Sequence, residues 1–125
     1  MRTSPKKSSP PSPSTGSFRN RAEIRAAWWL RRRGYRVLDH NRWLGGAELD
    51  LVVRRGRVLA FVEVKSKTGD GFGDPLEMVD DVKVARIRRA AQLWLAAHPE
   101  SGPLQVRFDV IADRAGRIEH LRDAF

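Results

Sequence analysis

Residues 46–65 read GAELDLVVRRGRVLAFVEVK, a pattern that predicts two β-strands joined by a short turn. The first strand runs from Ala47 to Val53 and the second from Val58 to Lys67, with the polar residues RRGR between them. A glycine in such a polar break supplies the positive φ that a tight turn needs. The two strands are therefore expected to pair antiparallel.

Acidic residues occupy both strands of this hairpin, Glu48 and Asp50 on the first and Glu63 on the second. If the loop is Arg55–Gly56, Glu48 faces Glu63 directly and Asp50 lies diagonal to Glu63. The strand period of two then places all three acids and Lys65 on one face. A diagonal pair lies about 7 Å apart between Cα atoms, which lets two carboxylates reach one ion. A three-residue loop would break this parity.

These residue types are those that metal-assisted phosphodiester hydrolysis needs. Mg²⁺ takes oxygen ligands and keeps several of its waters, so Asp50, Glu63 and the carbonyl of Val64 are the predicted ligands of Mg²⁺ or Mn²⁺. The ammonium of Lys65, beside the ion and the phosphate, can orient or help to deprotonate the attacking water and offset developing charge.

An acid and a base two positions apart on a strand usually mark a solvated face. Here the second strand looks buried on both faces, because Val58, Ala60, Val62 and Val64 line one face and Leu59 and Phe61 the other. Buried carboxylates are costly unless they are paired or bound to a cation. This favours a functional role over a surface ion pair.

The spacing of Asp50 from Glu63 and Lys65 resembles the PD-(D/E)xK nuclease superfamily, and more closely its YraN-like family of endonucleases. The resemblance implies a restriction-endonuclease-like α/β fold with a mixed β-sheet flanked by helices, Mg²⁺ as the cofactor and DNA as the substrate. One departure is Ala47, where the family usually has glycine. The residues that carry the resemblance are Glu23, Ala26, Trp29-Leu30, Gly34, Asn41, Gly46–Leu51, Phe61–Lys65, Phe72-Gly73, Lys83, Arg107–Val110, Ile118–His120 and Ala124-Phe125.

The composition fits one basic domain. The chain has 125 residues and no cysteine, which excludes disulfides and cysteine-based zinc sites. Residues 1–17 are rich in Ser and Pro and are expected to form a disordered tail, followed by a single nuclease-like domain over residues 18–125. The tail holds three of the 24 basic residues and none of the 15 acidic ones, so the domain itself remains basic. A polyanionic partner, nucleic acid rather than a membrane, is expected.

No apolar run approaches the length of a membrane span, and the first residues lack the apolar core of a secretory signal. A cytoplasmic location is therefore expected. The remaining elements are predicted as a helix over Asn20–Arg33, a strand over Tyr35–Asp39, a helix over Asp80–Ala97, and strands over Leu104–Ala112 and Arg117–Leu121.

Several residues outside the hairpin are secondary candidates. Glu23, on the first helix, could hold a metal-bound water or pair with a neighbouring arginine on the surface. Trp28, Trp29 and Trp94 are predicted to be core residues, and Asp109 to serve structure. Contacts to nucleic acid are predicted for Lys83, Arg86 and Arg89 on the long helix, and for Arg42 and Trp43 in a loop.

The sequence therefore predicts a Mg²⁺-dependent nuclease in which Asp50, Glu63 and Lys65 are catalytic, with Glu48 and Glu23 as secondary carboxylates. The alternative is a non-catalytic nucleic-acid-binding module with a nuclease-like fold. The sequence leaves open whether the substrate is DNA or RNA, whether it is linear or branched like a recombination intermediate, and whether a homodimer is needed to cut two strands.

Overall fold

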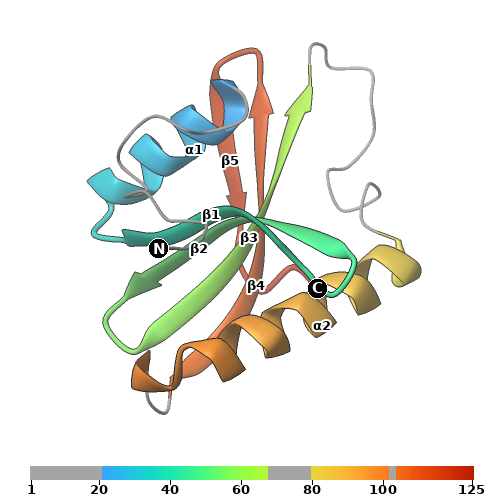
Figure 1. Ribbon diagram of the computed structural model, residues 1–125. Helices are drawn as coiled ribbons and strands as arrows, with labels where there is room; N and C mark the ends of the chain where they lie inside the picture. The colour runs from blue at the N-terminus through green and yellow to red at the C-terminus, as the bar shows by residue number, and fades with distance from the viewer. Residues whose placement is uncertain (1–20, 68–79, 102–103) are drawn as a thin grey trace.

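The computed structural model describes residues 21–67, 80–101 and 104–125 (Figure 1). The expected tail over residues 1–17, the predicted first helical residue Asn20 and the family residues Phe72-Gly73 lie outside these ranges. The elements in chain order are α1 (Arg21–Arg32), β1 (Arg36–Leu44), β2 (Ala47–Arg55), β3 (Val58–Lys67), α2 (Asp81–Ala97), the short 3₁₀ helix η3 (Pro99–Ser101), β4 (Gln105–Arg114) and β5 (Arg117–Leu121).

The five strands form one mixed sheet in the order β1-β2-β3-β4-β5. Strands β3 and β4 pair parallel, with α2 in the connection between them, and the other neighbours pair antiparallel. Helix α1 covers one face of the sheet and α2 covers the other (Figure 1). This confirms the predicted α/β architecture, a mixed sheet flanked by helices that is consistent with a restriction-endonuclease-like fold.

Strand β3 is the centre of the core, because its alternate residues contact the two helices. Leu59 and Phe61 pack with Trp94 and the rest of the apolar side of α2. Ala60 and Val62 pack with the apolar side of α1, and all four of these β3 residues are at most 2% exposed. The predicted burial of both faces of this strand is confirmed. Burying a charged residue at the end of the strand therefore costs free energy unless that charge is paired.

The β2–β3 hairpin forms as predicted, but its register differs from the expected one. The loop is Gly56–Arg57, since Arg55 pairs with Val58. Gly56 has φ 61°, at the first loop position, where a type II′ turn takes glycine. The loop still has two residues, so the shared face is kept, whereas the predicted direct opposition of Glu48 and Glu63 is wrong. The ladder ends at the pair Leu51–Val62, and one more pair would set Asp50 opposite Glu63.

Strand β1 is longer than predicted and continues through Trp43 to Leu44, where a strand ending at Asp39 was expected. Asn41 lies inside it with φ 48°, a left-handed conformation that asparagine tolerates better than most residues. The β1–β2 turn takes its positive φ angles at Gly45 and Gly46, so Ala47 begins β2 without strain. Trp43 therefore belongs to a strand and not to the predicted loop.

Helix α2 begins where the sequence predicts, because the Asp80 side chain accepts a hydrogen bond from the Lys83 backbone N–H at 2.8 Å. Of the three tryptophans predicted as core residues, Trp94 is 1% exposed and Trp29 is partly buried. Trp28 is 57% exposed, so its prediction was wrong. It lies outside the stripe of Ala22, Ala26, Ala27 and Leu30 that α1 turns toward the sheet.

A polar network fastens the end of the chain to β4. Asp109 is fully buried and accepts hydrogen bonds from the Arg107 guanidinium and from the Asp123 backbone N–H, and it lies 2.8 Å from His120 Nε2. The Ala124 backbone N–H donates to the Phe108 carbonyl. The contacts of Asp109 agree with its predicted structural role. None of the helices in the described residues is long and apolar enough to cross a bilayer.

Candidate functional site

Asp50 lies on β2 one residue beyond the last pair of the β2–β3 ladder. Its Oδ2 accepts a hydrogen bond from the Val64 backbone N–H at 2.9 Å, so a side chain takes over the contact between the strands where the backbone ladder ends. The N–H and C=O of one residue point to the same side of a strand. The carbonyl of Val64 is therefore directed toward the β2 side, where Asp50 lies.

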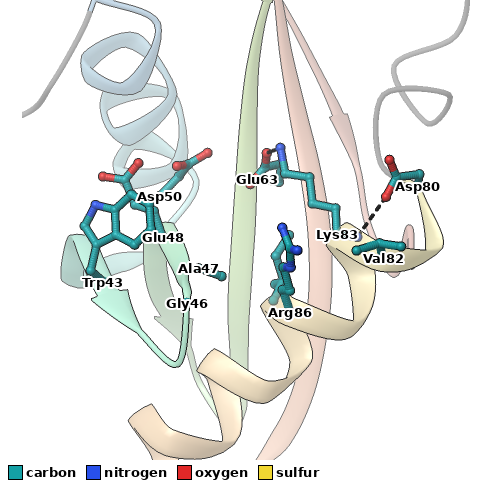
Figure 2. Close-up of a pocket in the computed structure, with 11 residues that line it drawn as sticks. Trp43, Gly46, Ala47, Glu48, Asp50, Glu63, Asp80, Val82, Lys83 and Arg86 are labelled. Carbon is teal, nitrogen blue, oxygen red and sulfur yellow. Dashed lines mark hydrogen bonds and ion pairs between the residues drawn. The ribbon is translucent and has the colours of Figure 1, made fainter.

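Glu63 lies on β3 and is 6% exposed. Two ammonium groups contact the same carboxylate oxygen, Oε2: Lys65 Nζ at 2.9 Å and Lys83 Nζ at 2.5 Å. Lys65 comes from the same strand, two residues on, whereas Lys83 reaches across from the first turn of α2 (Figure 2). The buried acid is thus matched by two cations.

The pKa values of Asp50 and Glu63 are shifted in opposite directions. Burial, followed by repulsion from Glu63, raises the pKa of Asp50 to about 8 from its ordinary 3.8, against the opposing effect of the Val64 N–H. Burial acts to raise the pKa of Glu63 as well, but the hydrogen bonds from Lys83 and Lys65 outweigh it and lower that pKa. Two neighbouring carboxyl groups with divergent pKa values are typical of functional sites.

Asp50 and Glu63 line a pocket of about 420 Å³ between the β1–β2 hairpin and the start of α2. Figure 2 shows Glu48 and Asp50 on one side and Glu63 with Lys83 and Arg86 on the other. The pocket wall is completed by Trp43, Gly46, Ala47, Asp80, Val82 and Ile87. The three acids predicted to share one face are thus brought together around a single cavity.

A second pair of acids meets at Asn41, beside the first. The Asn41 side-chain amide donates to Glu23 Oε1 at 3.0 Å and, at a longer 3.4 Å, to Glu48 Oε2. Glu23 is 4% exposed although it lies near the start of α1, and its charge contributes to the raised pKa of Asp50. No role for Asn41 was predicted from the sequence. Its presence in the family pattern was the available signal.

The predicted nucleic-acid contacts divide into two groups. Trp43, 59% exposed, and the first two basic residues of α2, Lys83 and Arg86, line the pocket. Arg42 and Arg89 are not among the residues that line it. The Arg42 guanidinium donates to Asp39 at 3.0 Å, and the Arg89 side chain lies beside Gly45, in the turn between β1 and β2.

The donor set suits a hard cation held with water. Within residues 21–67, 80–101 and 104–125, no three side chains of His, Cys, Asp or Glu form a cage for a metal. Mg²⁺ is usually held by one or two carboxylates together with water, and carbonyl oxygens suit it as well. Asp50, Glu63 and the Val64 carbonyl match this pattern. A cation between the two acids would also relieve the repulsion that raises the pKa of Asp50.

Comparison with known proteins identifies relatives along most of the chain. The sequence model of the uncharacterised protein family UPF0102 matches residues 22–112, which include both strands of the site. A UPF0102 protein of Beutenbergia cavernae is 46% identical over 102 residues, or 78% of this chain and 86% of that protein.

Two further relatives carry the same family name. A UPF0102 protein of Anaeromyxobacter dehalogenans is 44% identical over 109 residues, covering 82% of this chain and 79% of its own. One of Frankia alni is 47% identical over 97 residues, covering 74% and 80%. The chain therefore belongs to the uncharacterised protein family UPF0102, the family of the YraN-like proteins.

Proposed function

We propose that this protein is a Mg²⁺-dependent nuclease that hydrolyses phosphodiester bonds in nucleic acid, with DNA as the expected substrate. The observation that carries the proposal is the meeting of Asp50 and Glu63 in one pocket, where Lys65 and Lys83 both contact Glu63. A cluster of neighbouring acids and ammonium groups in a concave site is what metal-assisted phosphoryl chemistry needs.

In this proposal, metal binding and activation of the water are assigned to different residues. Asp50, Glu63 and the carbonyl of Val64 hold the ion, for which Mn²⁺ can substitute. A bound Mg²⁺ would supply Lewis acidity to the scissile phosphate and to a water molecule. Lys65, already beside Glu63, either takes a proton from that water as the neutral amine or, as the ammonium, orients the water and offsets the charge that develops on the phosphorus oxygens.

The remaining residues position water and substrate. Glu48 and Glu23, joined through Asn41, form a second carboxylate pair suited to holding an ordered water. Lys83 neutralises Glu63 and lines the pocket, where it would also be within reach of the substrate phosphate. Trp43 and Arg86 line the pocket and contact the nucleic acid close to the cleaved bond. Arg42 and Arg89 are proposed to contact the phosphate backbone of the nucleic acid farther from the cleaved bond.

A second candidate is a non-catalytic nucleic-acid-binding module with the same fold. It is favoured by one observation: the ammonium groups of Lys65 and Lys83 both contact the buried Glu63 carboxylate and can balance its charge. On this hypothesis the acids and lysines only stabilise the pocket.

Cleavage assays with Mg²⁺, Mn²⁺ or EDTA on linear, flapped and four-way DNA and on RNA separate the two candidates. We expect cleavage by the wild type to need the divalent ion and to collapse in Asp50→Asn and Glu63→Gln. Asparagine is preferred to alanine at position 50, because its Oδ1 can still accept the Val64 N–H. Binding without metal should hold in Asp50→Asn, because Asp50 is largely protonated near pH 7, and should hold or improve in Glu63→Gln, which removes a negative charge.

Lys65→Ala should keep metal binding but lose roughly 10²- to 10⁴-fold in rate, the usual scale for a positioned proton-transfer group. Glu119→Gln is the matched control, because Glu119 is half exposed and lies on β5. If the wild type cleaves none of the substrates and Glu63→Gln binds ion and nucleic acid as the wild type does, the nuclease proposal fails and the binding module takes its place.

A further inference from the structure

Helix α1 presents a second group of aromatic and basic side chains, separate from the acidic pocket. Arg25, Trp28, Trp29 and Arg32 recur at intervals of three and four residues, so they share one face of the helix, and Arg33 directly follows its last residue. With Ile118 of β5 they line a groove of about 470 Å³. Figure 1 shows α1 beside β5. None of these residues has a role in the proposed cleavage.

One tryptophan of this groove is fixed and the other is exposed. Trp29 packs edge-on against His120, with 5.3 Å between ring centroids, and the Arg33 guanidinium carbon lies 3.5 Å from the centre of the Trp29 ring. Trp28 is 57% exposed, and the Arg31 guanidinium carbon lies 5.7 Å from its ring centre. A large aromatic surface at the edge of a basic groove is available for stacking.

Among the arginines of the groove, likewise, one is held in place and another is exposed. Arg25 is anchored by its ion pair with the buried Asp113. Arg32 forms no ion pair with any residue that the structure describes, and it is exposed in the last turn of α1. The groove therefore combines an exposed ring with at least one uncompensated guanidinium.

We propose that this groove binds unpaired nucleotides of a single-stranded nucleic acid. Trp28 stacks on one base, and Arg32 and Arg33 contact the phosphates on either side of it. Base stacking on an aromatic side chain accepts any base, and guanidinium groups suit phosphate. The choice of nucleic acid as the ligand rests on the proposed function, which this inference deepens by naming substrates that carry an unpaired strand.

The position of the groove relative to the site supports a shared ligand. Glu23 contributes to the acid cluster, and Trp28 follows it by five residues on the same helix. At a rise of 1.5 Å per residue, the two lie about 7.5 Å apart along the helix axis. At 3.6 residues per turn the two side chains also point about 140° apart around the helix, so a strand reaches the groove from the acid cluster by passing around α1.

A lipid surface fits this region less well. The main apolar stripe of α1, which includes Ala26, Ala27 and Leu30, is packed against the sheet. What remains apolar and exposed on the helix is Ile24 and Trp28. An interfacial helix needs a continuous apolar face to enter the headgroup region, and this helix has already buried its own.

The test measures the affinity of the full-length protein for a short fluorescein-labelled oligothymidine by fluorescence anisotropy, in EDTA so that no cleavage occurs. We expect Trp28→Ala to weaken binding about tenfold, the scale of one lost stacking contact, and Trp28→Phe to retain most of the affinity. Arg32→Ala should reduce the slope of log affinity against log salt by about 0.7, the value of one phosphate contact on a single strand.

Arg88→Ala is the matched control for charge, because Arg88 is exposed on α2, on the opposite face of the sheet. The inference is overturned if Trp28→Ala binds the oligonucleotide as the wild type does, or if Arg32→Ala changes the salt slope no more than Arg88→Ala. Loss of binding to phosphatidylglycerol vesicles in Trp28→Ala, with oligonucleotide affinity unchanged, would assign the groove to a membrane and also overturn it.

These outcomes are independent of cleavage. A protein that cuts no substrate but loses oligothymidine affinity in Trp28→Ala would refute the nuclease proposal and support the groove. Metal-dependent cleavage by the wild type, together with normal binding of oligothymidine by Trp28→Ala, would support the nuclease proposal and refute the role of the groove. Asp50→Asn should bind the oligonucleotide at least as well as the wild type in either case.

Discussion

Replacing Asp50 with asparagine should stabilise the metal-free protein at neutral pH. Burial and repulsion from Glu63 make the ionised form of Asp50 costly in the folded state, where its pKa is about 8 instead of 3.8. Asparagine has nearly the same shape as protonated aspartate and carries no charge. Its Oδ1 can accept the Val64 N–H, and its amide can donate to the Glu63 carboxylate.

The sign and size of the effect follow from linkage. Between pH 3.8 and about 8 the folded state holds one proton more than the unfolded state at this position, so its stability falls as pH rises through that window. A pKa difference of one corresponds to about 1.4 kcal/mol, which gives a penalty of about 4 kcal/mol at pH 7. Local relaxation around the charge reduces this value, and we expect about 2 to 4 kcal/mol.

The assay is urea denaturation in EDTA at a series of pH values between 4 and 8. The difference between Asp50→Asn and the wild type should be small near pH 4 and grow toward pH 8. Glu119→Gln removes a half-exposed carboxylate and should change stability by less than about 0.5 kcal/mol at every pH. An asparagine variant that is no more stable than the wild type at pH 7 to 8 would refute this account of the site.

Three other results follow from the structure. Magnesium binding near pH 7 should release a proton from Asp50, measured by calorimetry in buffers of different ionisation enthalpy; equal heats in all buffers would contradict the raised pKa. Asp109→Ala should destabilise the fold by about 3 to 5 kcal/mol, because it leaves the largely buried Arg107 without its ion-pair partner, and a loss below about 1 kcal/mol in chemical denaturation would show the network to be dispensable. Deleting residues 1–17 should leave the melting temperature unchanged and weaken DNA binding only modestly; an unfolded truncated protein would show that these residues belong to the domain.

The parts of the fold that local pattern determines were predictable. The β2–β3 hairpin and α2 follow from apolar periodicity, from the glycine in the break and from the Asp80 cap. The pairing of Asp50 with Glu63 in one site followed from the strand period, which survives a two-position shift of register. The register itself was not predictable, because the run RRGR allows a two-residue loop on either side of Gly56, and only packing selects one.

The parts that depend on tertiary docking were not predictable. Lys83 was expected to follow a phosphate backbone, yet it contacts Glu63, because the start of α2 packs against the end of β3. Trp28 was predicted as a core residue together with Trp29, although the helical spacing of Ala22, Ala26 and Leu30 includes Trp29 and leaves Trp28 outside the buried stripe. The continuation of β1 to Leu44 depends on a left-handed Asn41, which local propensity does not favour within a strand.

The hydrogen bond from the Val64 N–H to Asp50 also provides a spectroscopic probe of the pocket. That amide is held by a side chain at the point where two strands separate, so its proton senses the Asp50 carboxylate directly. Its NMR chemical shift should follow the titration of Asp50 and move again when an ion arrives. A single resonance in the middle of the sheet would thus report the charge state of the pocket without any substrate being known.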